Sequence, residues 1–336
     1  MMDGARVRLF REGRGEDQRA FADWLNLSLG RKYDKARISR WESGAERVPV
    51  QVAGFLVEQG AGAVKAIQRP VILTVANQKG GVGKTSSAVN FAYLFASEGY
   101  RTLFVDLDPQ ASATAYLGVD QKEAHAAGKT IVSVLKEDAR VIDCIIPVLD
   151  GKMSMLASTI AAAGLELGLA NDPVNGGALV FRRKLAEVQD HFDFIVIDTN
   201  PSLSMLTVNA LNAADFVLIP VQTEQLASLG LSLLLETVGK IRQNTNPKLE
   251  VLGILPTMHT TRNVAEKLAL QEIHELFGSK IRIFDPIPRT TKFTQSVMLN
   301  QPLVKADPTS PGTDVYRAIA GLVIKHATEE VRHVPA

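Results

Sequence analysis

A short segment of the chain combines glycines, two lysines and a threonine in a spacing that suits phosphate binding. It follows an apolar run, 71–76, and reads Asn77-Gln78-Lys79-Gly80-Gly81-Val82-Gly83-Lys84-Thr85. Glycines permit a tight turn whose backbone N–H groups point inward at phosphate oxygens. A lysine at the end of such a loop reaches the β- and γ-phosphates, and the hydroxyl that follows it binds Mg²⁺. The segment therefore predicts a site for a nucleotide triphosphate.

This loop is a variant of the usual pattern, which requires a glycine where the chain has Gln78. It carries an extra lysine, Lys79, at its mouth, and a second cation there can meet phosphates bound in a facing subunit. The alternative is an ordinary glycine turn before a helix with an exposed lysine. We expect nucleotide contacts from every residue of one continuous run: Lys79, Gly80, Gly81, Val82, Gly83, Lys84, Thr85 and Ser86.

Carboxylates follow two other apolar runs, 102–105 and 194–197. Asp106 and Asp108 come after the first run and can position the attacking water or water bound to Mg²⁺. Asp198 comes after the second run, where the acid that holds Mg²⁺ usually lies. Each aspartate could instead only cap a turn or a helix. We expect catalysis from Lys79, Lys84, Asp106 and Asp108, and metal contacts from Thr85, Asp106 and Asp198.

Strands and helices that alternate along the chain would bring these side chains together. The predicted strands are 71–76, 102–106, 194–198, 216–220 and 251–255, and the predicted helices are 85–97, 178–189, 203–213, 225–242, 264–276 and 314–325. Continuous Val/Ile/Leu strands separated by helices indicate an α/β fold with a mostly parallel, doubly wound sheet. In such sheets the strand C-termini face one ligand crevice.

The net charge of the chain hides two regions of different character. The whole chain has a formal charge of +1, but residues 1–69 hold 13 Lys/Arg and 9 Asp/Glu, whereas the remaining residues hold 24 and 27. Glycine and alanine at 60–63 break the pattern, and Pro70 precedes the first apolar strand. We expect a basic N-terminal domain over 1–69 and a nucleotide-binding domain over 70–336.

The N-terminal segment resembles the helix-turn-helix of Cro/repressor-like DNA-binding domains, most clearly over 35–44. Ile38 and Trp41 would face a small all-α core. The stretch 27–34 is longer than the tight turn such a motif uses, and a helical dimerisation domain is the alternative. The side chains that could reach phosphates or base edges are Lys35, Arg37, Ser39 and Arg40.

The rest of the chain, roughly 70–325, resembles the ParA/MinD family of P-loop ATPases, and its ParA (Soj-like) branch in particular. The resemblance rests on 79–85, on 106–110 and on Asp198-Thr199 with Pro201. Two later segments look like the family's adenine-side residues, which here would be Pro256, Thr257, Met258 and Pro288. The sequence departs from the family at Asn200, where proline is usual.

The resemblance implies a function. ATP and Mg²⁺ would hold a sandwich homodimer in which Lys79 contacts the nucleotide of the other subunit and Asp108 positions the attacking water. The dimer would bind DNA without sequence preference, and a ParB-type centromere-binding partner would stimulate hydrolysis to ADP. The N-terminal domain could also repress the protein's own operon. Lys240 and Arg242, near the end of one long predicted helix, are candidates for contacts to DNA.

Several related classes are disfavoured by residue content. Cys144 is the only cysteine, so sites that need several thiolates are excluded. The chain has no Asn-Lys-x-Asp guanine reader and no amphipathic membrane-targeting tail. We therefore expect a cytoplasmic, nucleoid-associated DNA partition ATPase that does not bind a membrane. Two alternatives stay open: an ATP-switched transcriptional repressor, and a related ATPase that positions a cargo other than DNA.

Overall fold

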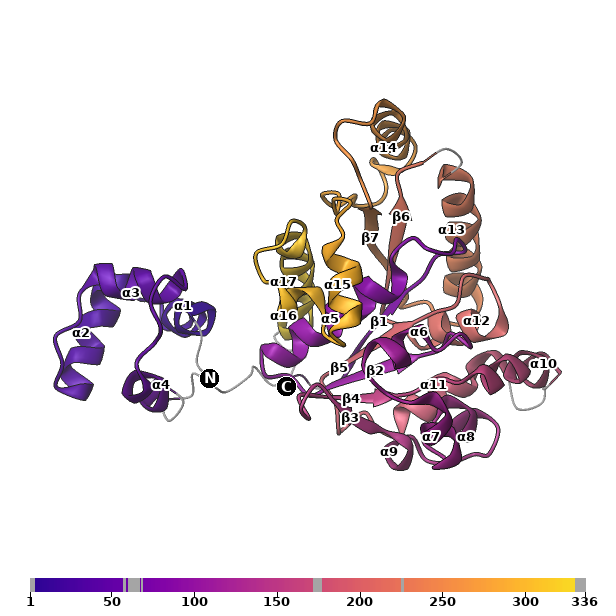
Figure 1. Ribbon diagram of the computed structural model, residues 1–336, viewed down its shortest axis with the longest axis horizontal. Coiled ribbons are helices and arrows are strands. Elements are labelled where there is room, and N and C mark those ends of the chain that lie inside the picture. Colours follow the sequence, from indigo (N-terminus) through magenta and orange to yellow (C-terminus); the bar gives the residue numbers. More distant parts are fainter. Residues whose placement is uncertain are drawn as a thin grey trace. The chain divides into compact units, whose positions relative to one another are not determined.

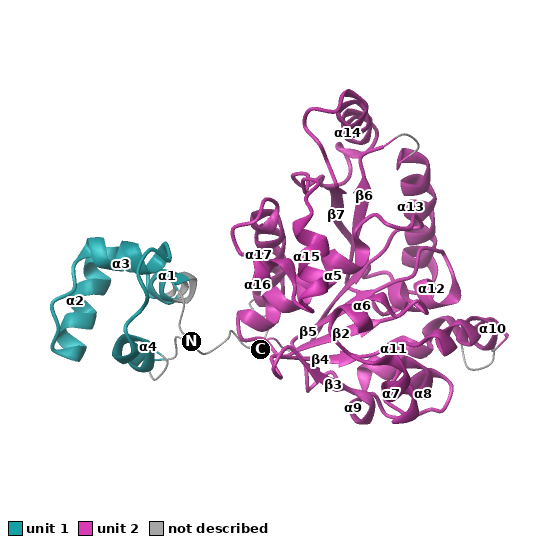
Figure 2. Ribbon diagram, viewed as in Figure 1, with its two compact units in different colours: residues 1–66 teal, residues 67–336 magenta. Residues whose placement is uncertain are grey.

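The computed structural model describes residues 4–56, 59, 67, 69–171, 177–224 and 227–329. The chain forms two compact units, 1–66 and 67–336 (Figure 2). The sequence places the domain boundary between residues 69 and 70, and most of the segment around it lies outside the described residues. The assignment of these units as separate functional domains therefore stays a prediction.

The N-terminal unit is helical, with α1 (Gly4–Gly13), α2 (Gln18–Leu29), α3 (Lys35–Glu42) and α4 (Val50–Leu56). Gly30 ends α2 in the left-handed conformation, and the Asp34 carboxylate caps α3. The connection between these helices is therefore 30–34, which is shorter than the stretch 27–34 considered from the sequence. The buried core of this unit comprises Val7, Phe21, Ala22, Leu25, Ile38, Trp41, Val52 and Leu56.

The second unit contains a seven-stranded sheet in the order β3-β4-β2-β5-β1-β6-β7. All neighbouring strands are parallel except β3 and β4. The strands are β1 (Val71–Val75), β2 (Thr102–Asp106), β3 (Ile146–Val148), β4 (Met153–Leu156), β5 (Phe194–Asp198), β6 (Phe216–Gln222) and β7 (Glu250–Thr257). The five strands predicted from the sequence are present, and the mostly parallel α/β fold is confirmed.

Helices cover both faces of this sheet (Figure 1). The longer ones are α5 (Lys84–Ser97), α12 (Met205–Ala213), α13 (Ala227–Asn244), α14 (Val264–Phe277) and α17 (Thr313–Glu329). The shorter ones are α6 (Ser112–Tyr116), α7 (Gln121–Ala126), α8 (Ile131–Leu135), α9 (Val141–Cys144), α10 (Leu165–Ala170), α11 (Val180–Ala186), α15 (Lys292–Met298) and α16 (Leu303–Ala306), with 3₁₀ turns at Ile160–Gly164 and Gly177–Leu179.

The position of β1 determines where a ligand can bind. It lies between β5 and β6 in the sheet. After β1 the chain first adds β2 on the β5 side of the sheet, and it later crosses to the opposite side to form β6. Such a reversal opens a crevice at the carboxyl ends of the strands. The loop 76–83 begins at this crevice, between the ends of β5 and β6. Within the part of the chain that the structure describes, no helix is long and apolar enough to cross a membrane.

Candidate nucleotide-binding site

The phosphate loop has the backbone that its glycines predict. Gly81 and Gly83 have φ angles of 75° and 84°, in the left-handed region that disfavours residues with a Cβ. Gly83 is the N-cap of α5, and no side chain caps the free N–H groups of that helix end. These N–H groups and the positive end of the helix dipole make the loop suitable for phosphate.

Lys84 is the first residue of α5, and its side chain is folded into the loop. Its Nζ donates a hydrogen bond of 2.9 Å to the carbonyl oxygen of Lys79, and the residue is only 6% exposed. Burial lowers the pKa of Lys84, and the charges of Asp198 and Asp108 act in the opposite direction. The ammonium is thus placed among the loop's N–H groups, where phosphate oxygens would bind.

Thr85 and Asp198 come from different elements and meet at the end of the loop. The Thr85 hydroxyl donates a hydrogen bond of 2.6 Å to Asp198 Oδ2. The other oxygen, Asp198 Oδ1, is buried and has no hydrogen-bond partner among the described residues. An unpartnered carboxylate oxygen beside a threonine hydroxyl fits the donor set of Mg²⁺, which prefers oxygen ligands. The two residues therefore lie as their predicted metal role requires.

Asp106 and Asp108 flank a sharp turn after β2. Asp106 is fully buried and accepts hydrogen bonds from the backbone N–H of Asp108 and from both the N–H and the hydroxyl of Thr114. Both of its oxygens are therefore occupied in holding this turn. Asp108 Oδ1 accepts a hydrogen bond of 2.9 Å from the N–H of Gln110. The metal role of Asp106 and the catalytic role of Asp108 stay predictions.

Burial affects the two strand-end acids most strongly. Burial raises the pKa of Asp106 to about 7, and the charge of Asp108 adds to the effect, while its hydrogen bonds oppose it. Burial and the neighbouring Asp106 also raise the pKa of Asp198. Clustered carboxyls with raised pKa values, beside a loop suited to phosphate, are typical of a functional site.

Lys79 has a partner that could not be inferred from its neighbours in the sequence. Its ammonium forms an ion pair with Glu224, which follows β6, while half of the lysine side chain is exposed. The backbone N–H of Lys79 donates to Asn77 Oδ1, and Asn77 Nδ2 donates to the Pro220 carbonyl at 2.6 Å. The mouth of the loop is therefore tied to β6 by two contacts.

The residues expected on the adenine side lie at the end of β7. The Thr257 hydroxyl donates to the Val82 carbonyl at 2.9 Å, which joins the end of this strand directly to the phosphate loop. Met258 has a φ of 52°, and the following residue, His259, pairs with Pro288. Pro256 accepts a hydrogen bond from the Ile287 N–H. The segment that contains Pro288 thus lies beside the end of β7, and the adenine contacts of these residues stay predictions.

Sequence reasoning missed the polar contacts that hold α5 against the C-terminal part of the chain. The Ser87 and Tyr316 hydroxyls lie 3.1 Å apart, and Asn90 Oδ1 accepts from the Val304 N–H at 2.9 Å. Asn90 also donates to the carbonyl of Ser86, which is a predicted nucleotide contact. A serine at 87 and an asparagine at 90 on an otherwise apolar helix were the available signals.

The residues predicted to contact DNA lie on two helices, one in each unit. On α3, Lys35, Ser39 and Arg40 are exposed and Arg37 is half-buried, while Ile38 and Trp41 are buried as expected. Arg37 and Arg40 both form ion pairs with Glu46. On α13, Lys240 pairs with Glu236 and Arg242 is exposed. These contacts to DNA stay predictions.

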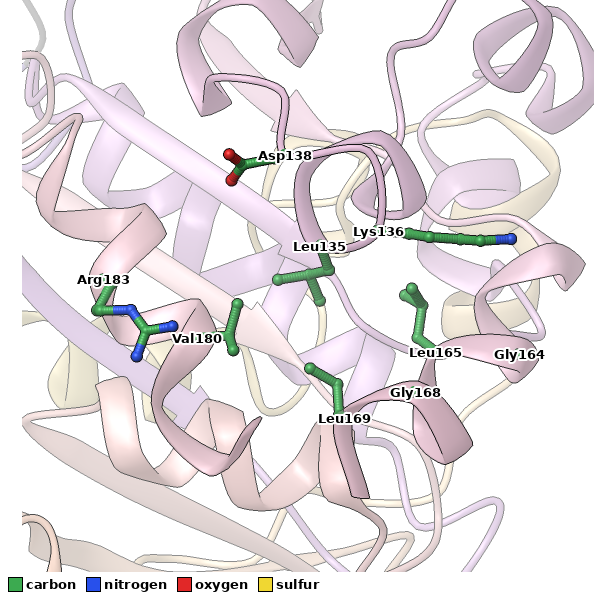
Figure 3. A pocket seen from close by; sticks show the side chains of 9 residues that line it. All are labelled: Leu135, Lys136, Asp138, Gly164, Leu165, Gly168, Leu169, Val180 and Arg183. Atoms are coloured by element: carbon green, nitrogen blue, oxygen red, sulfur yellow. The ribbon is translucent and has the colours of Figure 1, made fainter. Parts of the chain in front are cut away.

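None of the predicted site residues lines a cavity of about 580 Å³ in the second unit (Figure 3). Its walls come from α8, α10 and α11 and from the turns beside them. They consist of Leu135, Lys136, Asp138, Gly164, Leu165, Gly168, Leu169, Val180 and Arg183. Its walls mix apolar and charged side chains, but among the described residues no phosphate-binding loop reaches it, so it lacks the feature that would recognise a nucleotide triphosphate.

Comparisons with known proteins agree with the geometry of the loop. Residues 71–251 match the family described as an AAA domain. The sporulation initiation inhibitor protein Soj of Bacillus subtilis is 36% identical over 249 residues, which cover 74% of this chain and 96% of Soj.

Two solved structures with bound nucleotide analogues are also similar to this chain. Cobyrinic acid a,c-diamide synthase from Mycobacterium smegmatis, with a bound ATP analogue and magnesium, is 32% identical with a TM-score of 0.66, covering 80% of this chain and 99% of that one. A plasmid partition protein from Borrelia burgdorferi bound to AMPPNP is 27% identical with a TM-score of 0.63, covering 77% and 100%. With its variant phosphate loop and its strand-end acids, the chain belongs to the Soj/ParA family of P-loop ATPases.

Proposed function

We propose that this protein is a DNA partition ATPase. ATP and Mg²⁺ bind at the phosphate loop and hold two copies of the chain in a sandwich dimer. The dimer binds DNA without sequence preference and is associated with the nucleoid in the cytoplasm. A ParB-type protein on a centromere stimulates hydrolysis, and the ADP form leaves the DNA.

The observation that carries this proposal is the arrangement around the loop 79–85. Lys84 lies inside the loop, and Thr85 hydrogen bonds to Asp198, whose free oxygen fits a metal ion. When bound, Mg²⁺ supplies charge neutralisation to the phosphates. Thr85 and Asp198 would hold it, directly or through water, and Asp108 would orient the attacking water. Lys79, half-exposed at the mouth of the loop, would contact the nucleotide of a second copy.

The curated relatives support partition as the task that this ATPase serves. The chain spans nearly the whole of Soj, and a chromosome partitioning protein ParA from Myxococcus xanthus is also 36% identical. We infer that a ParB-type partner and DNA complete the hydrolysis site of this protein, because phosphoryl transfer depends on positioning and charge more than on covalent chemistry.

The second candidate is an ATP-switched transcriptional repressor. It is favoured by one observation, the separate N-terminal unit with exposed Lys35, Ser39 and Arg40 on α3. A short α2–α3 connection and a helix with basic, exposed residues suit insertion into the major groove. In a partition protein the same unit would read an operator and repress the operon.

The deciding experiment measures ATP hydrolysis with and without DNA, and with and without the product of the adjacent gene. A partition ATPase hydrolyses ATP slowly alone and faster when both are present. A Lys84→Ala strain should lose partition. Normal partition in that strain would overturn the proposal. A second test deletes residues 1–69. If operator binding is lost while partition is intact, repression belongs to the N-terminal unit alone.

A further inference from the structure

Asn200 is a buried asparagine whose amide nitrogen and amide oxygen both have hydrogen-bond partners. It is 7% exposed. Its Nδ2 donates to Glu166 Oε1 and to Ser204 Oγ, each at 3.2 Å. Its Oδ1 accepts from the Thr207 hydroxyl at 2.7 Å and from the Ser204 hydroxyl at 3.4 Å. This side chain therefore joins the start of α12 to Glu166 on α10.

The segment that carries Asn200 lies between the metal-binding acid and the phosphate loop. Asp198 is two residues earlier, and the hydroxyl of Thr199 donates to the Val75 carbonyl at 3.0 Å. On the other side, Pro201 lies against the loop, since a Cβ added at Gly80 would be 3.9 Å from the Cβ of Pro201. Segment 198–201 therefore connects Asp198 to the end of β1 and to the phosphate loop.

Glu166 is bound by this asparagine and not by a cation. It is half-buried on α10, and among the described residues no lysine, arginine or histidine forms an ion pair with it. A carboxylate that accepts a hydrogen bond from a buried amide fixes the direction of that amide, because only the Nδ2 side can face it. The Oδ1 side is then turned toward Thr207 and Ser204.

We propose that Asn200 and Glu166 are positioning residues for ATP hydrolysis. The amide of Asn200, oriented by Glu166, holds segment 198–201 in the conformation that places Asp198 beside Thr85. Neither residue touches the nucleotide. Loss of the correct orientation moves Asp198 and lowers the rate of hydrolysis, while the phosphate loop still binds nucleotide through Lys84 and its backbone.

The test exchanges the chemical groups of the two side chains. Asn200→Asp keeps the size and the oxygen that Thr207 and Ser204 use, but it places a carboxylate opposite Glu166. The double variant Asn200→Asp with Glu166→Gln restores one amide and one carboxylate with the direction of the hydrogen bond reversed. The matched control is Asn171→Asp, the same chemical change at an exposed residue that ends α10.

Each full-length variant is assayed for kcat and KM of Mg²⁺-dependent ATP hydrolysis, for ADP affinity and for the midpoint of thermal unfolding. We expect Asn200→Asp to lower kcat about tenfold, a change of about 1.4 kcal/mol in activation free energy, with KM and ADP affinity within about twofold. The double variant should recover kcat to within about threefold of the unmodified protein. The control should keep its kcat.

Two results would overturn the proposal: an unchanged kcat in Asn200→Asp, or a double variant that is as slow as Asn200→Asp alone. If Asn200→Asp is not folded at the assay temperature, Glu166→Ala decides the question, because its side chain is only half-buried. Glu166→Ala should lower kcat while the unfolding midpoint stays unchanged. If kcat of Glu166→Ala equals that of the unmodified protein, the positioning role is refuted.

Discussion

Asp106 and Asp198 are paired in register on the neighbouring parallel strands β2 and β5, and both are fully buried. Both strands end at these residues, so two carboxyl groups share one buried environment at the crevice. Burial raises the pKa of both, and the charge of Asp106 adds to the effect on Asp198. Thr114 and the Asp108 N–H satisfy the oxygens of Asp106, whereas Asp198 keeps one oxygen unpartnered. The pair is therefore asymmetric, and Asp198 is the member available to a cation.

Asp198→Asn should separate nucleotide binding from metal use. The amide oxygen can still accept from Thr85, so the loop keeps its shape, but the ligand charge for Mg²⁺ is lost. We expect nucleotide affinity without Mg²⁺ to change less than about threefold, while the gain in affinity on adding Mg²⁺ falls at least about tenfold.

Without metal, the Asp198→Asn protein should unfold at a higher temperature than the unmodified one, because a buried carboxyl beside another has been removed. Titrations of a fluorescent nucleotide and thermal unfolding, each with and without Mg²⁺, check both statements. An unchanged response to Mg²⁺ would remove Asp198 from the metal site.

Lys79→Ala and Glu224→Gln should have opposite effects on dimerisation. The ion pair with Glu224 competes with any contact from Lys79 to the nucleotide of a second copy. Lys79→Ala should leave nucleotide binding measurable and impair ATP-dependent dimerisation. Glu224→Gln should strengthen it by up to about fivefold, because a half-exposed ion pair contributes about 1 kcal/mol at most.

Analytical ultracentrifugation with a non-hydrolysable ATP analogue measures this dimerisation in both variants. The ADP-bound forms serve as the control, since neither substitution should change their oligomeric state. Dimerisation that is equal in Lys79→Ala and the unmodified protein would contradict the role of Lys79 in the facing subunit.

Asp108→Ala should trap the protein in its ATP-bound form. Asp108 lies in the turn after β2, and its hydrogen bond to Gln110 is local, so its removal should not unfold the site. If it orients the attacking water, the turnover rate falls by at least about a hundredfold while ATP is still bound. Single-turnover hydrolysis and DNA retention measured together test this, and normal turnover would exclude the role.

The sequence was sufficient to predict the sheet and the loop because both depend on local patterns. Buried strands such as 194–198 are continuous apolar runs, and Gly81 and Gly83 stand where the backbone needs a positive φ. The strands β3 and β4 and the short helices α6 to α10, α15 and α16 were missed, since segments of three to seven residues carry too little periodicity.

Contacts between distant residues could not be predicted in the same way. The Glu224 partner of Lys79 and the Glu166 partner of Asn200 lie 145 and 34 positions away in the chain. A glutamate on an exposed turn or a short helix looks like any other solvated charge until the fold brings it to its partner. Asn200 itself was noted as a departure, and its buried hydrogen bonds give the physical reason why an amide fits there.

Lys240→Ala and Arg242→Ala should weaken non-specific DNA binding in a salt-dependent manner. Both are near the end of α13, and Lys240 is held by Glu236 only through an exposed pair. Each lost phosphate contact should reduce the slope of log affinity against log salt by about 0.9. Affinity for DNA of random sequence, measured at several salt concentrations, tests this. Lys248, an exposed lysine beyond the helix, provides a matched control as Lys248→Ala.

Glu42 should control the acid stability of the N-terminal unit. It is buried and accepts hydrogen bonds from Arg11 and Gln18, with Arg8 3.7 Å away. Burial would raise the pKa of Glu42, but the hydrogen bonds and the arginine charges outweigh it and lower the pKa below 4.5. The carboxylate therefore stabilises the folded state above pH 4.5, and this contribution is lost as the pH falls through the lowered pKa.

The fluorescence of tryptophan reports this unit alone, because Trp24 and Trp41 are the only tryptophans in the chain. We expect its unfolding midpoint to be steady between about pH 7 and pH 5 and to fall below that. Glu42→Gln should lower the midpoint at pH 7 by an amount that corresponds to about 1–3 kcal/mol of unfolding free energy. It should also weaken the dependence of the midpoint on pH under acidic conditions. Glu46→Gln, which removes two ion pairs nearer the surface, should keep most of that pH dependence. If the midpoint of Glu42→Gln still falls with pH as it does in the unmodified protein, the titrating group lies elsewhere.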